Sequence, residues 1–158
     1  MPIVTVPDLP TRLARNQRLM GLDLGTKTIG LAISDPGLSI ASPLDTLARG
    51  KFHQDLERLM RHVRDGDVGG LVLGLPVNMD GSEGPRCQAT RAFADNLLAR
   101  HDLPLAFWDE RLSTAAVERM LIAEADLSRR RRAEVVDKLA AAYILQGALD
   151  HIKAQAST

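Results

Sequence analysis

The sequence predicts an α/β fold in which helices flank a mixed β-sheet, and three patterns carry this prediction. Two short apolar runs, residues 18–25 and 28–34, predict two antiparallel strands joined by a tight turn. Residues 52–63 repeat apolar side chains every three or four positions, which is typical of an amphipathic helix. Residues 68–76 form a continuous apolar run that ends at a proline, as expected of a strand buried on both faces. Strands that come first and then alternate with helices favour a mixed sheet covered by helices.

The other elements follow from the same patterns. We expect a third strand over residues 39–49, an interior strand over 103–110, and helices over 86–100, 114–124 and 133–150. Pro43 favours an edge or a bulge for the third strand. Residues 1–17 contain several prolines and arginines without sustained periodicity, so we expect a flexible N-terminal extension before a single domain over residues 18–153.

Composition narrows the class of protein. The 158 residues are 45% hydrophobic, and 20 lysines and arginines balance 20 aspartates and glutamates, so a polyanion would have to be held by a local basic patch. Cys87 is the single cysteine, which excludes an internal disulfide and a cysteine zinc cluster. No apolar stretch reaches the length of a membrane span, and the first 18 residues lack the apolar core of a secretory signal. We therefore expect a cytoplasmic protein with no membrane partner.

Asp23 is a carboxylate inside the first apolar run. Because side chains alternate along a strand, Leu22 and Leu24 point one way, while Asp23 points the other way together with neighbouring glycines. The second strand also carries a face of small residues, 30, 32 and 34, so aligned small faces would leave room for a ligand above Asp23. A buried carboxylate costs several kcal/mol unless it is paired. The alternative is an aspartate that caps a turn at the strand end.

Two further positions offer carboxylates. Asp109 and Glu110 end an apolar strand, and only one of them can share the face of the strand's alternate residues, although periodicity does not decide which. Asp137 lies at the edge of an alanine-rich helix face that would allow close approach to the sheet; the alternative is a solvated helix aspartate. Three converging carboxylates would favour magnesium or manganese over zinc.

Four sequence blocks carry a resemblance to a known family. They are "GLDLGTKTIGLAISD", "VLGLPVNMDGSEG", "DERLST" and "VVDKLAAAYILQ", in this order. Together they resemble the YqgF/RuvX family, whose members are named as pre-16S rRNA nucleases and as Holliday junction resolvases. The resemblance covers roughly residues 18–150. It implies a ribonuclease H-like fold related to the RuvC resolvases.

The resemblance also implies an acidic triad of Asp23, Glu110 and Asp137, which would be both the catalytic residues and the metal ligands. Two divalent ions, Mg²⁺ or Mn²⁺, would activate a water and neutralise the leaving oxygen during phosphodiester hydrolysis. The function implied is 5′-end processing of pre-16S rRNA in ribosome biogenesis, with Holliday junction resolution as the alternative. Symmetric cleavage of a junction needs two active sites and hence a dimer. The sequence shows no long apolar stripe that would indicate a dimer face. We therefore favour pre-rRNA as the partner, with ribosomal precursor particles and branched DNA as further candidates, and a monomer or weak homodimer.

Basic and polar residues near these blocks are candidates for substrate binding. Four consecutive arginines directly precede the helix that carries Asp137 and could grip backbone phosphates, although such a run can also be a solvated loop. The candidate substrate-binding residues are Arg111, Arg129, Arg130, Arg131, Arg132, Lys27 and Asn78.

Two other classes of function compete with a nuclease. The "DLGT" segment also resembles the first phosphate loop of the sugar kinase, actin and Hsp70 ATPases, but those proteins close two such domains around ATP and this chain has residues for one. No G-x-x-x-x-G-K-[ST] motif is present. The second competitor is a non-catalytic factor of transcription or ribosome assembly in which the acidic residues are residual.

Overall fold

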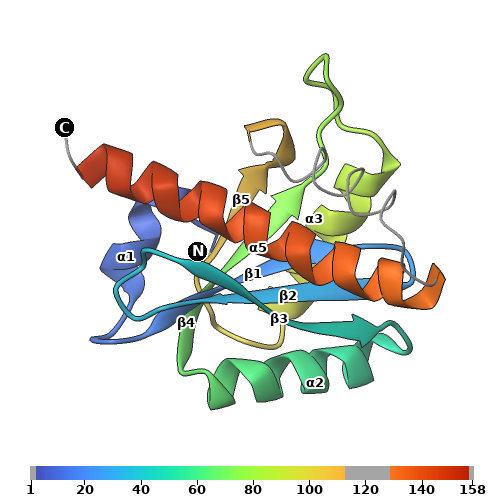
Figure 1. The fold of residues 1–158 in the computed structure, drawn as a ribbon, viewed down its shortest axis with the longest axis horizontal. Helices are drawn as coiled ribbons and strands as arrows, with labels where there is room; N and C mark the ends of the chain where they lie inside the picture. The colour runs from blue at the N-terminus through green and yellow to red at the C-terminus, as the bar shows by residue number, and fades with distance from the viewer. Residues whose placement is uncertain (1–2, 113–128, 157–158) are drawn as a thin grey trace.

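A five-stranded mixed sheet forms the centre of the molecule (Figure 1). The computed structural model describes residues 3–112 and 129–156. The strands are β1 (Arg18–Leu24), β2 (Thr28–Ser34), β3 (Ala41–Ala48), β4 (Val68–Leu75) and β5 (Leu105–Asp109), in the order β3-β2-β1-β4-β5. The β1–β2 and β2–β3 pairs are antiparallel, whereas β4 is parallel to both β1 and β5. This arrangement confirms the predicted mixed sheet, and Pro43 lies in the edge strand beside a register shift, as expected.

Helices cover both faces of the sheet (Figure 1). The described helices are α1 (Leu9–Arg12), α2 (Phe52–Asp65), α3 (Pro85–Leu98) and α5 (Arg129–Ala156), with 3₁₀ turns η1 (Val6–Asp8) and η2 (Glu110–Leu112). Helix α5 crosses one face, while α2 and α3 pack on the other. Helix α5 contains the helix predicted over residues 133–150 and extends beyond it at both ends. The helix expected over residues 114–124 lies outside the described residues. None of the described helices is both long and apolar enough to cross a bilayer.

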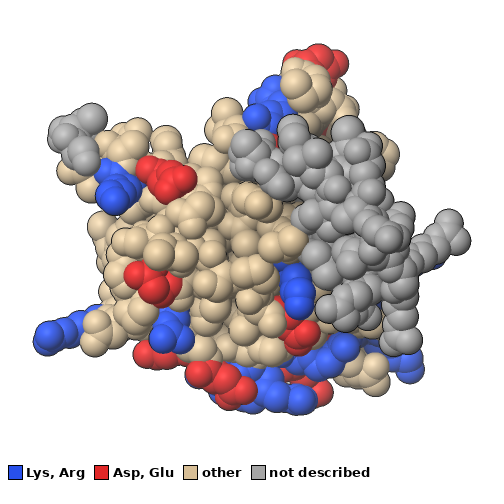
Figure 2. Space-filling view, in the orientation of Figure 1, with Lys and Arg blue, Asp and Glu red and all other residues tan. Residues whose placement is uncertain are grey.

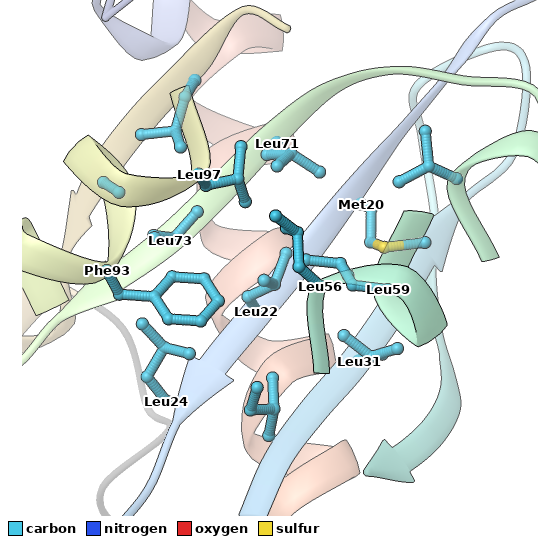
Figure 3. Packing of buried hydrophobic residues seen from close by; sticks show 14 of the residues in the cluster. Met20, Leu22, Leu24, Leu31, Leu56, Leu59, Leu71, Leu73, Phe93 and Leu97 are labelled. Atoms are coloured by element: carbon cyan, nitrogen blue, oxygen red, sulfur yellow. The ribbon is translucent and has the colours of Figure 1, made fainter. Parts of the chain in front are cut away.

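The larger core lies between the sheet and helices α2 and α3 (Figure 3). Leu22 of β1 and Leu31 of β2 are fully buried there, against Leu59 of α2 and Leu97 of α3. Alternation along the strands therefore sends the bulky side chains of β1 and β2 to this face. The small residues, with Asp23 among them, are left on the face toward α5.

Helix α5 packs closely on the sheet because glycines face it. A Cβ on Gly21 would lie 2.7 Å from the Cβ of Leu145, and a Cβ on Gly74 would lie 2.5 Å from Cδ1 of Ile144. A Cβ on Gly30 would collide with the main-chain carbonyl of Asp137. A Cβ at Gly21 or Gly30 would require the helix itself to shift, whereas one at Gly74 would require the Ile144 side chain to move, so the glycines allow the close contact between helix and sheet.

Residues 3–17, where we expected a flexible extension, contact the domain in the structure. Ile3 forms a parallel bridge with Leu105, and the Val4 amide donates to the Leu105 carbonyl at 2.8 Å, so the segment covers the start of the β5 edge. Val6 and Leu9 are buried in the cluster beneath α5. The sequence did not predict this packing, because isolated apolar residues between prolines produce no periodic pattern.

Candidate functional site

An open pocket lies at the end of β1, between the β1–β2 turn and α5. Its acidic lining residues are Asp23 and Asp137, and its basic lining residues are Lys27 and Arg86. The rest of the lining comes from the turn itself. The pocket volume is about 420 Å³. That is within the range of about 300–1,000 Å³ that is usual for ligand sites.

Asp23 is buried in the strand interior rather than exposed at a turn. Its side chain is 4% exposed, and its register partner across the antiparallel pair is Gly30. The β1–β2 turn is closed by a main-chain bond in which the Gly25 amide donates to the Thr28 carbonyl at 2.9 Å. Asp23 is placed as its strand alternation predicted, on the small-residue face and lining the pocket.

Asp137 reaches the same pocket from α5. Its main chain lies directly over Gly30, and the hydroxyl of Thr28 donates a hydrogen bond to its carboxylate. The side chain is only partly buried. The close approach of α5 to the sheet is what brings this helix carboxylate to the strand that pairs with Asp23.

The structure distinguishes Asp109 from Glu110. Glu110 is 8% exposed, and its Cδ would lie 3.3 Å from a Cβ on Gly74, so its carboxyl lies over β4 on the α5 face. Asp109 is instead held by Arg111, whose Nη2 lies 2.6 Å from Oδ2. The guanidinium lowers the pKa of the Asp109 carboxyl below its ordinary value. Ala106 and Trp108 belong to the cluster beneath α5, so alternation extended from them could have assigned Glu110 to this face.

The three expected carboxylates lie near the carboxyl-terminal ends of the parallel strands, but they do not form a single cluster. β1, β4 and β5 are adjacent, so Asp23 and the carboxyl of Glu110 over Gly74 are one strand apart. The pocket lining includes Asp23 and Asp137. Among residues 3–112 and 129–156, no group of three His, Cys, Asp or Glu side chains is close enough to hold a metal ion. The donor chemistry fits a hard cation, but Glu110 would have to approach the other two carboxylates.

The loop that follows β4 projects beyond the sheet (Figure 1). Asn78 closes this loop: its Nδ2 donates to Oγ of Ser82 at 3.1 Å, and its main-chain N–H donates to the Ser82 carbonyl at 3.0 Å. Arg111, a candidate for substrate binding, pairs with Asp109 and donates from Nη1 to the Met79 carbonyl at 3.5 Å. Asn78 and Arg111 therefore belong to the loop region and do not line the acidic pocket.

The other basic candidates either line the pocket or belong to an element that contributes a residue to it. Lys27, in the β1–β2 turn, is exposed and lines the pocket. The run Arg129–Arg132 forms the start of α5, so the backbone is helical where a loop was the alternative expectation. The side chains of this run lie outside the described part of the structure.

Sequence reasoning missed two arginines beside the pocket, Arg49 and Arg86. They follow β3 and begin α3, respectively, and both reach the turn after β1. Nothing in their sequence spacing relates them to Asp23, because the sheet order brings β3 and α3 to this turn.

Charge is mixed over the face that α5 covers. Figure 2 shows few charged side chains over the middle of α5, and acidic and basic side chains mixed along the edge at α2. Among the coloured residues, this view shows no broad basic surface, in agreement with the balanced composition. Binding of a polyanion at the pocket would therefore depend on the few cations next to it.

Comparisons with known proteins identify the family. Residues 17–151 match the family model described as RuvX: Holliday junction resolvase. A Paramagnetospirillum magneticum protein, whose name marks it as an inferred pre-16S rRNA nuclease, is 64% identical over 151 residues, which are 96% of this chain and 97% of that protein. A Rhodospirillum centenum protein of the same name is 62% identical over 158 residues, covering 97% of this chain and 84% of that protein.

Solved structures identify the fold. Thermus thermophilus RuvC has a TM-score of 0.51 at 12% identity, over 90% of this chain and 98% of that one. T. thermophilus RuvC in complex with a Holliday junction substrate gives 0.53 at 11% identity, over 90% of this chain and 97% of that one. These likenesses confirm the ribonuclease H-like fold. Since the family match and the high identities span nearly the whole sequence, this chain belongs to the RuvX family.

Proposed function

We propose that this chain is a metal-dependent nuclease that hydrolyses phosphodiester bonds, with Asp23, Glu110 and Asp137 as its catalytic residues. The observation that carries the proposal is the shared pocket of Asp23 and Asp137, a strand carboxylate and a helix carboxylate brought together across Gly30. Membership of a family of nucleases supports the same activity. The N-terminal segment is then an addition to one nuclease domain over residues 18–153.

The same three carboxylates would hold Mg²⁺ or Mn²⁺, two ions in our proposal. Bound there, the metal would make a water nucleophilic at neutral pH and neutralise charge on the leaving oxygen. Asp23 is fixed by its strand, and Asp137 is oriented by the Thr28 hydroxyl. Glu110 follows β5 in a 3₁₀ turn, and we propose that it approaches the other two carboxylates when metal binds.

Substrate contacts fall into two regions in this proposal. Lys27 and the run Arg129–Arg132 would bind backbone phosphates near the carboxylates, because Lys27 lines the pocket and the run begins the helix that carries Asp137. Arg111 and Asn78 would contact substrate farther away, at the projecting loop.

We propose that the substrate is pre-16S rRNA, trimmed at its 5′ end in the cytoplasm, alone or within ribosomal precursor particles. The names of the close relatives support RNA. The description of the family model supports a four-way DNA junction as the second candidate. A monomer or weak homodimer suits trimming, whereas symmetric junction cleavage needs two sites acting together.

Cleavage by the purified chain tests both candidates. A pre-16S rRNA 5′ fragment and a four-way DNA junction would each be incubated with magnesium, with manganese and with EDTA, with Asp23→Asn as the inactive control. We expect metal-dependent cleavage of the RNA fragment that the control lacks. Symmetric cleavage of the junction alone would favour the resolvase, and ATP turnover with no cleavage of either substrate would favour the ATPase class. Inactivity in all of these assays would favour a non-catalytic factor.

A further inference from the structure

Arg49, which follows β3, and Arg86, in the first turn of α3, both approach the turn after β1. Arg49 donates from Nη1 to the Gly25 carbonyl at 2.7 Å, and Arg86 donates from Nη2 to the Leu24 carbonyl at 3.4 Å. Both line a small pocket next to the acidic one, and Arg86 lines both pockets. The two guanidinium groups therefore lie beside the strand end that carries Asp23.

These cations are not neutralised by acidic partners. Within the described ranges, neither arginine has a carboxylate oxygen within 4.0 Å, unlike Arg58, Arg91 and Arg111. A guanidinium carries five N–H donors, and the structure shows one main-chain hydrogen bond for each. Arg49 and Arg86 are both exposed. Each can thus bind an anion from solvent while it holds the turn.

A phosphodiester that enters the acidic pocket needs such cations. Asp23 and Asp137 repel the phosphate backbone, and the chain has no net positive charge to attract it. Lys27 adds a third basic side chain at the same turn. Planar guanidinium groups match phosphate oxygens through paired hydrogen bonds, which a single ammonium cannot provide.

We propose that Arg86 and Arg49, assisted by Lys27, bind the backbone phosphate next to the scissile one. The proposal rests on the nuclease function above and defines one side of the substrate path. The strand would pass the end of β1 between α3 and the end of β3, so that the two arginines set its register against the carboxylates. Arg49 and Arg86 are positioning residues in this role, since neither would contact the reacting atoms.

Binding without cleavage tests the proposal. A fluorescein-labelled single-stranded RNA of mixed sequence would be titrated with wild type, Arg86→Gln and Arg49→Gln in EDTA, at several salt concentrations, by fluorescence anisotropy. Arg61→Gln is the matched control, because Arg61 is an exposed arginine of α2 that lines neither of the two pockets. We expect each pocket variant to bind about 10-fold more weakly, with a salt slope lower by about 0.7. The control should match wild type.

A second measurement separates phosphate binding from support of the turn. Arg86→Lys keeps the charge, so it should retain the wild-type salt slope while losing part of the affinity. If Arg86 only supports the Leu24 carbonyl, both Arg86 variants would lower the melting temperature and neither would change the slope. That result would overturn the proposal.

RNA with single methylphosphonate linkages locates the phosphate. Neutralising the bound phosphate should weaken wild type but not Arg86→Gln further, whereas other linkages should weaken both proteins equally. Equal effects at every linkage would contradict a defined subsite. Because no cleavage is measured, a chain that binds RNA through these arginines and fails to cut it would refute only the nuclease function. A nuclease whose Arg86 and Arg49 variants bind like wild type would refute only the subsite.

Discussion

The main-chain carbonyl of Asp137 on α5 lies against the α-carbon of Gly30 on β2. Gly30 is also the register partner of Asp23 on β1. One glycine therefore connects the strand carboxylate and the helix carboxylate of the proposed site, because a side chain at residue 30 would separate them. The distance between α5 and the sheet becomes part of the site geometry.

Gly30→Ala should damage both the fold and the site. The added Cβ would collide with the main chain of Asp137, and a helix backbone cannot rotate away as a side chain can. We expect a loss of about 3 kcal/mol in the free energy of unfolding, at the upper end of the usual range for overpacked cores. Urea unfolding followed by circular dichroism measures this loss. Gly50→Ala is the control, since its Cβ would meet only Oδ1 of Asp55 at 3.9 Å, and it should stay within about 0.5 kcal/mol of wild type.

The sequence was sufficient to predict the elements that depend on local pattern. The alternation of Leu22, Asp23 and Leu24 placed the carboxylate on the small-residue face, where it is found. The alanine-rich face around Asp137 predicted close packing of the last helix, and the contact with Gly30 confirms it. Both inferences needed only the strand and helix periods.

Features that depend on the sheet order could not be predicted in this way. Arg49 and Arg86 are separated from Asp23 along the chain and meet the same turn only because β1 lies between β2 and β4. The preference of Arg111 for Asp109 depends on which way one strand end points. Burial of Leu9 has no periodic signal at all. These are properties of tertiary packing, not of local sequence.

Thr28→Val should weaken metal binding without unfolding the protein. Valine keeps the shape and suits a strand, but it removes the hydroxyl that donates to the Asp137 carboxylate. Residues that orient a metal ligand typically contribute about 10- to 100-fold in affinity, so we expect a loss of that size in magnesium affinity, measured by calorimetry. Thr28→Ser keeps the donor and should bind nearly as well as wild type. An equal loss in both variants would show that the hydroxyl that donates to Asp137 is not what supports metal binding.

Arg111→Gln should lower stability at neutral pH but not under acid conditions. Because Arg111 lowers the folded-state pKa of Asp109, the pair stabilises the fold above the unfolded pKa of about 3.9. This contribution is lost as the pH falls through the folded-state pKa. Urea midpoints should therefore be lower for the variant at pH 7 and converge with wild type under acid conditions. In an Asp109→Asn background the same substitution should show no pH-dependent difference; a persistent one would point to another partner.

Replacing Arg129–Arg132 with alanine should separate binding from stability. Four positive charges at a helix start oppose the helix dipole, and alanine is at least as good a helix former. The variant should therefore melt no lower than wild type. If the run binds phosphates, RNA affinity should fall and the salt slope should decrease by up to about 3, at about 0.7 for each lost contact with a single strand. An unchanged slope in the anisotropy titration would remove the run from the substrate path.

Asp23→Asn should eliminate cleavage and the response of stability to metal. Asparagine has nearly the same size and keeps hydrogen-bonding capacity, so the strand should form, but the site loses the charge that a divalent ion needs. At a magnesium concentration of 100 times the dissociation constant, wild type should gain about 2.7 kcal/mol in unfolding free energy. The variant should gain almost nothing at the same concentration, and the two proteins should melt at similar temperatures in EDTA. Thermal melts with and without magnesium measure both quantities, and Asp45→Asn on the edge strand β3 controls for loss of an unrelated carboxylate.

Cleavage by Asp23→Asn at a rate near that of wild type would refute its role as a metal ligand, even if magnesium still raised the melting temperature of both proteins.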